Sequence, residues 1–340
     1  MLDCPDLDPA SPIQFVINAA AGSSDAETKR EVIEAALRVA GRCGEVVFSG
    51  PDELALVAHR AATKAKVSHA ALVAVGGDGT INTVAQAAHA MGCAMGVVPQ
   101  GTFNYFARTH GIPSDPAEAV RLLLNCTPLP VQVAAVNDRV FLVNASLGLY
   151  PDLLEEREAY KARFGRSRWV AFWAASATLL RAQSKLRLSI EQGAVTRELR
   201  TLTLFVGNNR LQLEQVGVHA ENSSLHTNNV GQITAVMLRP IGTLAMIRLM
   251  LRGAMGTLGE AQSIEHFEFE RMLVRPTLPP GRRGVKVAFD GEVARMRAPL
   301  NFRVLAKPLF LLKQRPEDTP TEKKADIATG TAAQPVGTGA

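Results

Sequence analysis

The chain of 340 residues has few of the features that mark exported, metal-caged or membrane-spanning proteins. Its four cysteines are scattered without a C-x-x-C spacing, which argues against a zinc site and a disulfide framework. The apolar run 169–180 is closed off by Arg168 and Arg181 and falls short of the roughly 18 residues that a span needs. The start is acidic and contains proline, unlike a signal peptide. We therefore expect a globular, cytoplasmic protein in a reducing compartment.

A large excess of one sign of charge is also absent, because 37 Lys and Arg stand against 32 Asp and Glu. The resulting net charge of +5 is modest and compatible with anionic partners such as phosphates or lipid headgroups. The sequence shows no basic motif interleaved with aromatic residues, so we expect no nucleic-acid partner. The 47% of hydrophobic residues is enough for packed cores, and the length favours two domains.

From residue 13 onward, short β-branched runs alternate with amphipathic segments. The predicted strands are 13–17, 46–48, 70–75 and 95–98, and the predicted helices are 28–40, 52–66, 80–90 and 116–124. Ser24 and Glu27 form a plausible capping box for the first helix. This rhythm predicts a doubly wound α/β domain, in which helices cover both faces of a parallel sheet.

After Pro130 the pattern changes to the period of two that is typical of half-buried antiparallel strands. The runs 131–136 and 140–143 predict a hairpin through Asn137 and Asp138. The second region is therefore expected to be mostly β, in an antiparallel, sandwich-like arrangement. Two predicted helical stretches, 152–183 and 243–255, interrupt it.

The sharpest motif is Gly76-Gly77-Asp78-Gly79-Thr80, which lies between a predicted apolar strand and a predicted helix. Glycines let the backbone turn tightly and approach a ligand, and the helix start offers free N–H groups to an anion. The motif predicts a phosphate cradle, although a turn that needs glycine for its geometry would look the same. It is neither the dinucleotide fingerprint nor a Walker loop. A carboxylate here makes sense if a magnesium ion or a ribose hydroxyl mediates.

A second loop, 99–108, follows the next apolar strand. The carboxyl ends of neighbouring parallel strands share one edge of a sheet, so both loops should face the same crevice. Thr80, Thr102 and Asn104 would supply hydroxyl and amide groups to a nucleotide there. Taken alone, the Pro-x-Gly-Thr of this loop is equally typical of a plain turn.

Taken together, four segments resemble the diacylglycerol kinase catalytic-domain family, which includes bacterial lipid kinases and, more distantly, sphingosine and ceramide kinases. They are GGDGTIN at 76–82, PQGTFNYFAR at 99–108, NAAAG at 18–22 and FDGE at 289–292. Their order and spacing match the family over 13–312.

The resemblance implies a phosphofructokinase-like, doubly wound N-terminal domain and a β-rich C-terminal domain, with ATP in the cleft between them. We expect the nucleotide-binding α/β domain at 12–129 and the β-rich lipid-substrate domain at 130–308. The family commonly returns its last strand to the first domain, here 309–313. The remaining 314–340 has almost no large apolar residue and is expected to be a disordered tail.

The resemblance also implies roles for individual residues, with ATP and Mg²⁺ as cofactors. The nucleotide contacts expected from it are Asn18, Ser49, Gly76, Gly77, Asp78, Gly79, Thr80, Asn82, Gly101, Thr102 and Asn104. Asp78 is expected to act in catalysis and to hold the metal. One carboxylate of the DGE segment would accept the proton of the lipid hydroxyl; both Asp290 and Glu292 are kept as candidates, with Glu292 slightly preferred. An Asp-Gly pair between alternating strands is also the signal of a simple hairpin.

We therefore expect an ATP-dependent lipid kinase, which transfers the γ-phosphate to a hydroxyl of a membrane lipid such as diacylglycerol. Its partners would be the lipid alcohol and, peripherally, the inner membrane face, where the basic and apolar stretch 152–183 suits an interfacial contact. An oligomer is compatible with this reading. The alternatives are an NAD kinase-like phosphotransferase and a catalytically silent lipid or nucleotide sensor.

Overall fold

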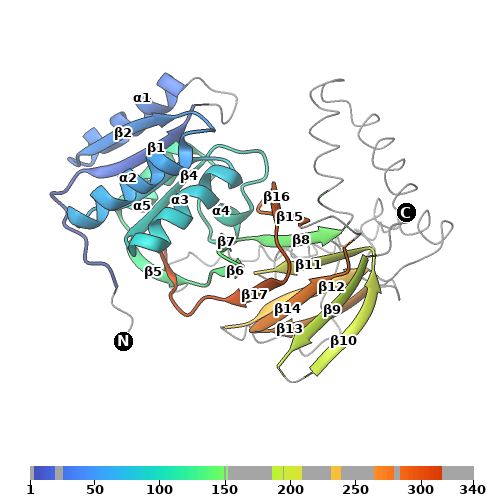
Figure 1. Cartoon of the computed structure of the whole chain (residues 1–340). Coiled ribbons are helices and arrows are strands. Elements are labelled where there is room, and N and C mark those ends of the chain that lie inside the picture. Colours follow the sequence, from blue (N-terminus) through green and yellow to red (C-terminus); the bar gives the residue numbers. More distant parts are fainter. Residues whose placement is uncertain are drawn as a thin grey trace, which may run out of the picture.

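The structure of the chain is a computed structural model. It describes residues 4–19, 26–148, 151, 186–193, 195–208, 231–238, 264–278 and 284–315. Over these ranges the chain forms three six-stranded sheets, with the helices gathered around the first (Figure 1). Ser24 of the predicted cap, both helical stretches predicted in the second region, and nearly all of the predicted tail lie outside the described residues.

The first sheet has the strand order β2-β1-β3-β4-β18-β5. Its strands are β1 (Ile13–Asn18), β2 (Gly44–Ser49), β3 (Leu72–Gly76), β4 (Ala94–Pro99), β5 (Thr127–Val131) and β18 (Leu309–Lys313). All neighbours pair in parallel except β18 and β5. Every residue of β3 is buried, as expected of a strand covered on both faces. The parallel sheet predicted for the N-terminal part of the chain is confirmed.

Helices cover this sheet in two groups. The helices are α1 (Ala26–Val39), α2 (Leu54–Val67), α3 (Asp78–Met91), α4 (Tyr105–Thr109) and α5 (Pro116–Leu124). α1 lies against α5, and α2 lies against α3. The strand order reverses after β2, so right-handed crossovers put α1 on one face of the sheet and α2 and α3 on the other. α5 leads into the antiparallel strand β5 and packs on the face of α1. No helix in the described part of the chain combines the length and the hydropathy needed to cross a membrane.

The two remaining sheets form the β-rich region. One has the order β10-β9-β14-β17-β6-β7, and the other has the order β13-β12-β11-β8-β15-β16. Their strands are β6 (Ala134–Val136), β7 (Arg139–Phe141), β8 (Asn144–Gly148), β9 (Leu186–Gln192), β10 (Val195–Thr201), β11 (Thr203–Gly207), β12 (Ile233–Leu238), β13 (Ile264–Phe269), β14 (Arg271–Pro276), β15 (Val285–Phe289), β16 (Glu292–Met296) and β17 (Leu300–Val304). All pairings between them are antiparallel. Phe302 of one sheet and Leu204 of the other share a single buried core, which confirms the predicted antiparallel β-rich region.

The prediction of one strand over 131–136 is wrong. Val131 ends β5 in the first sheet, whereas Ala134 begins β6 in a different sheet. The chain crosses between two cores here, because Val133 packs in the first core and Ala134 in the second. An uninterrupted run of small and β-branched residues carries no local sign of this crossing. The predicted hairpin through Asn137 and Asp138 is present and joins β6 to β7.

The last described strand, β18, lies inside the first sheet rather than in the β-rich region that precedes it. Phe310 pairs with Ala94 of β4 on one side and with Pro130 of β5 on the other. Leu311 is fully buried in the core of the first sheet. The chain thus leaves this sheet at β5, builds the β-rich region, and returns at β18.

Candidate functional site

The two glycine loops meet at one edge of the first sheet. β3 and β4 end on the pair Gly76 and Pro99, and the Gln100 N–H donates to the Gly76 carbonyl over 2.8 Å. A Cβ placed on Gly101 would lie 2.8 Å from the Cα of Gly77, closer than a Cβ comes to a non-bonded carbon in proteins. The loops therefore touch backbone to backbone, which requires glycine at the contact. The structure brings together the two loops that the sequence places at a common edge.

The first loop leads directly into the N-terminus of α3. Gly77 caps the helix without a side-chain hydrogen bond, and the first bond inside the helix runs from the Ile81 N–H to the Gly77 carbonyl over 2.9 Å. The N–H groups of a first helical turn lack acceptors within the helix, and the helix dipole makes this end attractive to anions. Asp78, Gly79 and Thr80 form this turn and line a cavity. The arrangement fits a bound phosphate.

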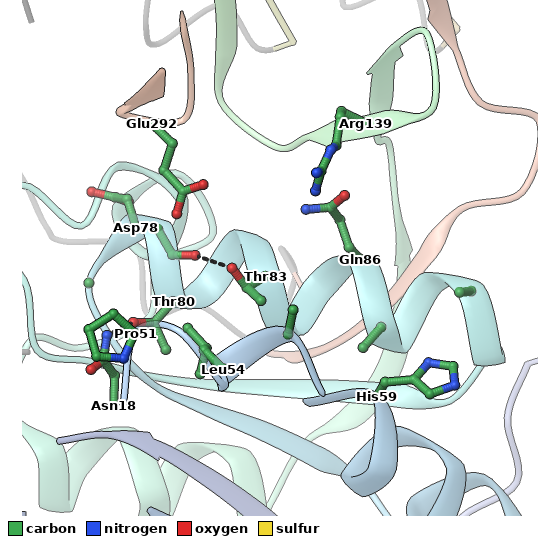
Figure 2. A pocket seen from close by; sticks show the side chains of 15 residues that line it. Asn18, Pro51, Leu54, His59, Asp78, Thr80, Thr83, Gln86, Arg139 and Glu292 are labelled. Carbon is green, nitrogen blue, oxygen red and sulfur yellow. Dashed lines mark hydrogen bonds between the residues drawn. The ribbon is translucent and has the colours of Figure 1, made fainter. Parts of the chain in front are cut away.

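That cavity has a volume of about 640 Å³ and runs along α3 (Figure 2). Asn18, at the end of β1, closes one side by donating from Nδ2 to Thr80 Oγ1 over 3.0 Å. The described residues that line the cavity are Asn18, Pro51, Leu54, Ala55, His59, Gly77, Asp78, Gly79, Thr80, Thr83, Gln86, Ala87, Ala90, Arg139 and Glu292. The cavity therefore has a polar end at the glycine loop and a more apolar end between α2 and α3.

Asp78 stands between the two loops. One of its carboxylate oxygens accepts a hydrogen bond from the Phe106 N–H over 3.4 Å, at the start of α4. Burial raises the pKa of Asp78, and the backbone N–H groups of Phe106, Tyr105 and Asn104 oppose this rise. These N–H groups offset the effect of burial only in part, and a cation beside the carboxylate would favour its ionised form.

The acidic side chains fit a magnesium ion that arrives with a nucleotide. Asp78 and Glu292 both line the cavity. Among the described residues there is no group of three or more His, Cys, Asp or Glu that could cage a metal. Magnesium in phosphate sites is usually held by one or two carboxylates together with phosphate oxygens and waters. Asp78, at the start of α3, is the residue that would hold such an ion.

Glu292 reaches the cavity from the β-rich region, on the hairpin of β15 and β16. Figure 2 shows its carboxylate pointing down over the glycine loop. A Cβ on Gly79 would lie 3.0 Å from Glu292 Oε1, so a larger residue there would push the carboxylate aside by a few tenths of an ångström. Partial desolvation by the surrounding protein raises the pKa of Glu292, and the positive charge of Arg139 lowers it. Glu292 is exposed to the cavity and can exchange a proton with a ligand there.

Asp290 lies two residues earlier but is 5% exposed and does not line the cavity. Its Oδ1 accepts hydrogen bonds from the N–H groups of Val143 (2.8 Å) and Asn144 (3.0 Å). Its Oδ2 accepts from the Leu142 N–H (2.7 Å) and from Asn82 Nδ2 (2.6 Å). Burial raises the pKa of Asp290 to about 6, despite these four donors. Asp290 therefore joins α3 to the β-rich region.

Two other predicted nucleotide contacts are engaged within the protein. Asn82 donates to the Val140 carbonyl (3.0 Å) as well as to Asp290, and its Oδ1 accepts from Gln86 Nε2 (2.8 Å). Ser49 is buried, and its hydroxyl donates to the Gly50 carbonyl over 2.9 Å. Neither residue is among those that line the cavity.

The predicted contacts of the second loop shape that loop. Asn104 has a left-handed backbone with φ of 48°, and its side chain bridges both backbone groups of Gly101 at 2.9 Å. Thr102 is exposed at the tip of the loop. Gly76 lies directly beneath Thr80, where a Cβ would come within 2.6 Å of the Thr80 side chain. A direct contact of these residues with a nucleotide stays a prediction.

Sequence reasoning missed four polar residues of the cavity, one of which, Thr83, donates its hydroxyl to the Gly79 carbonyl over 3.0 Å. Arg139, Gln86 and His59 line it, from β7, α3 and α2 respectively. Gln86 and His59 sit on predicted helices, where a polar residue is typical of any solvated face. Arg139 follows a hairpin turn, and only the packing of β7 against α3 brings it into the cavity. No local signal would have found it.

Part of the sequence is similar to known proteins. Residues 12–136 match the model of the diacylglycerol kinase catalytic domain. A probable lipid kinase, YegS-like, of Klebsiella pneumoniae (strain 342) is 40% identical over 98 residues, which cover 28% of this chain and 33% of that protein. Its counterpart in Pseudomonas aeruginosa (strain UCBPP-PA14) is 47% identical over 81 residues, covering 23% and 26%. The matched part of the chain thus spans a third or less of these relatives.

The fold has a counterpart among solved structures. A diacylglycerol kinase from Bacillus anthracis str. Sterne superposes with a TM-score of 0.62 at 17% sequence identity. The superposition covers 89% of this chain and 97% of that one. At this identity the likeness concerns the fold alone, and it includes the β-rich region, most of which lies beyond the family match at 12–136.

Proposed function

Because residues 12–136 match the model of the diacylglycerol kinase catalytic domain, we propose that the protein is an ATP-dependent lipid kinase. It transfers the γ-phosphate of ATP to the hydroxyl group of a membrane lipid such as diacylglycerol. The observation that carries the proposal is one cavity with a glycine-lined helix N-terminus on one wall and the Glu292 carboxylate on the other. The similarity to proteins named as probable lipid kinases supports a lipid as the acceptor.

In this proposal the phosphate chain of ATP lies at the N-terminus of α3. The backbone N–H groups of Gly77 to Thr80 bind the phosphate oxygens. Asp78 holds the magnesium ion, which supplies positive charge to the phosphates when bound. The lipid oxygen forms a bond to the γ-phosphorus, the bond from that phosphorus to the β-phosphate oxygen breaks, and its electron pair leaves with ADP.

Glu292 is the general base that accepts the proton of the lipid hydroxyl. Its carboxylate faces the glycine loop and is open to the cavity, whereas Asp290 is buried and accepts four hydrogen bonds. The desolvation that raises the pKa of Glu292 also brings this pKa nearer to the working pH, where a base is most effective. We therefore assign the base to Glu292 and a structural role to Asp290.

The acceptor places the enzyme at a membrane. A lipid alcohol resides in a bilayer, so the cytoplasmic protein would act peripherally at the inner membrane face. The phosphofructokinase-like type of the nucleotide domain belongs to the same proposal, as does ATP as the phosphoryl donor.

The proposal is tested with the full chain, γ-labelled ATP and magnesium, offered diacylglycerol in phosphatidylglycerol vesicles, free sphingoid base, or NAD. Label extracted into the organic phase supports lipid phosphorylation. Labelled NADP would instead establish the NAD kinase alternative. Nucleotide binding without transfer to any acceptor would leave a sensor and overturn the kinase assignment.

The role of Glu292 is tested by Glu292→Gln. We expect kcat to fall by about a hundredfold or more, because a positioned base contributes roughly 10²–10⁴. Thermal stability and ATP affinity should stay near the wild-type values, because the side chain is exposed. Glu270→Gln, an exposed carboxylate in the turn before β14, is the matched control and should keep full turnover. Full activity of Glu292→Gln would contradict the assignment.

A further inference from the structure

Arg139 belongs to the β-rich region but lines the cavity across from α3. It is the first residue of β7, directly after the hairpin turn at Asn137 and Asp138. Figure 2 shows its guanidinium directed into the cavity, beside the side-chain amide of Gln86. Among the described residues that line this cavity, Arg139 is the only lysine or arginine. The cavity thus pairs a helix N-terminus with one permanent cation.

Arg139 acts electrostatically on the base. Its positive charge lowers the pKa of Glu292 and thereby opposes the desolvation that raises this pKa. Arg139 and Glu292 enter the cavity from two different hairpins of the β-rich region. The two charged groups therefore interact electrostatically within one cavity.

The backbone beside Arg139 is held by the network that also places Glu292. Asn82 of α3 donates to the carbonyl of Val140, the neighbour of Arg139. Asp290, two residues before Glu292, accepts from the three successive N–H groups that follow β7. It also accepts from Asn82, which lies one helical turn beyond Asp78. A single network thus fixes the base, the cation and the glycine loop relative to one another.

We propose that Arg139 is a further catalytic residue of this site. Its guanidinium binds the phosphate chain of ATP from the wall opposite α3 and neutralises negative charge on the transferring phosphoryl group. The inference rests on the proposed function, because that function puts a polyphosphate in the cavity. A guanidinium suits the task, since it is always charged and donates two parallel hydrogen bonds to phosphate oxygens. Charge that develops in phosphoryl transfer is stabilised by groups already in place.

The test compares wild type with Arg139→Gln and Arg139→Lys in three measurements. The first is calorimetric binding of inorganic tripolyphosphate and of Mg–ATP. The second is kcat and KM for ATP with diacylglycerol vesicles. The third is the pH profile of kcat/KM. Arg295→Gln is the matched control, because it removes the same charge from β16, on the strand face opposite to Glu292.

For Arg139→Gln we expect tripolyphosphate affinity to fall about tenfold or more, as for a lost charge-assisted bond. We expect kcat to fall about a hundredfold, as for a lost donor to developing charge. The acidic limb of the pH profile should move to higher pH, because Glu292 loses the cation that favours its ionised form. Arg139→Lys should restore part of each change, and Arg295→Gln should match wild type.

The outcomes separate this inference from the proposed function. Equal tripolyphosphate affinity, turnover and pH profile in wild type and Arg139→Gln would overturn the role of Arg139 and leave the lipid kinase assignment intact. Tripolyphosphate binding that depends on Arg139, without labelling of any lipid, would overturn the assignment and leave the role. A wild-type protein that binds neither tripolyphosphate nor Mg–ATP and labels no lipid would overturn both.

Discussion

Asp290 and Glu292 stand two residues apart in one hairpin, yet their carboxylates meet opposite surroundings. Asp290 has a left-handed backbone with φ of 47° and turns inward to four hydrogen-bond donors. Glu292 begins β16 and faces the cavity. The sequence left both residues open as the base, because the donors that occupy Asp290 come from residues almost 150 positions away. A pattern of neighbours along the chain carries no sign of them.

The environment of Asp290 predicts a pH dependence of stability. Burial raises its pKa from 3.8 to about 6, so the folded protein keeps a proton that the unfolded chain has already released. This stabilisation is complete below about pH 4 and is lost as the pH rises through about 6. The free energy of unfolding should fall by something on the order of 3 kcal/mol across that window and then level off. Urea midpoints between pH 4 and 7 measure this step.

Other carboxylates titrate in the same range, so Asp290→Asn serves as the reference. The variant should be less stable at every pH, because its amide meets donors, and it should lack the step. The carboxyl ¹³C shift of Asp290 in the wild-type protein gives the pKa independently. Parallel stability curves for the two proteins, with an Asp290 shift that titrates near 4, would refute this prediction.

At the scale of elements, the apolar runs predicted where strands and helices lie, but not where the chain passes from one sheet to another. The helix predicted over 116–124 is α5 at those bounds, because Asp115 caps it by accepting from the Glu118 N–H and Pro116 opens its first turn. The helix α4 was not predicted, since five residues show no period and its start depends on the backbone of Asn104. Placement of the loops followed from strand order, whereas the cavity walls from β7 and β16 required the tertiary structure.

The contact of the two loops predicts that Gly101→Ala weakens nucleotide binding. The added Cβ would lie 2.8 Å from the Cα of Gly77, so the loops must separate, at a cost of about 1–3 kcal/mol. Because this strain falls on the phosphate-binding turn, we expect ATP affinity to drop about tenfold or more. Gly50→Ala is the control, as nothing lies within 4 Å of its added Cβ. Calorimetry with Mg–ATP decides, and unchanged affinity in Gly101→Ala would show that the loops act separately.

At the scale of the whole molecule, β18 joins the end of the described chain to the N-terminal sheet, between β4 and β5. Nothing in the local pattern of this apolar strand says which sheet it joins. Its position between β4 and β5 depends on pairings between residues more than 170 positions apart. Among sequence arguments, only the family resemblance suggested a return of the chain.

This arrangement predicts that one substitution in β18 destabilises the nucleotide region. Leu311 is fully buried, so Leu311→Ala should lower the free energy of unfolding by about 2–5 kcal/mol and reduce the temperature at which ATP binding is lost. Leu56→Ala on α2 is the control, because Leu56 is 53% exposed and its truncation should have a small effect. Urea denaturation and ATP binding during heating measure both. Equal losses in the two variants would contradict a structural role for β18.

The late position of β18 also has a consequence for biosynthesis. β1 begins at residue 13 and β18 at residue 309. At about 5–20 residues per second the ribosome therefore synthesises β18 roughly 15–60 s after β1. During that interval the α/β region must wait with β4 and β5 unjoined, while the intervening segment emerges and can fold ahead of it. A nascent chain released before β18 would carry both glycine loops without the strand that completes their platform.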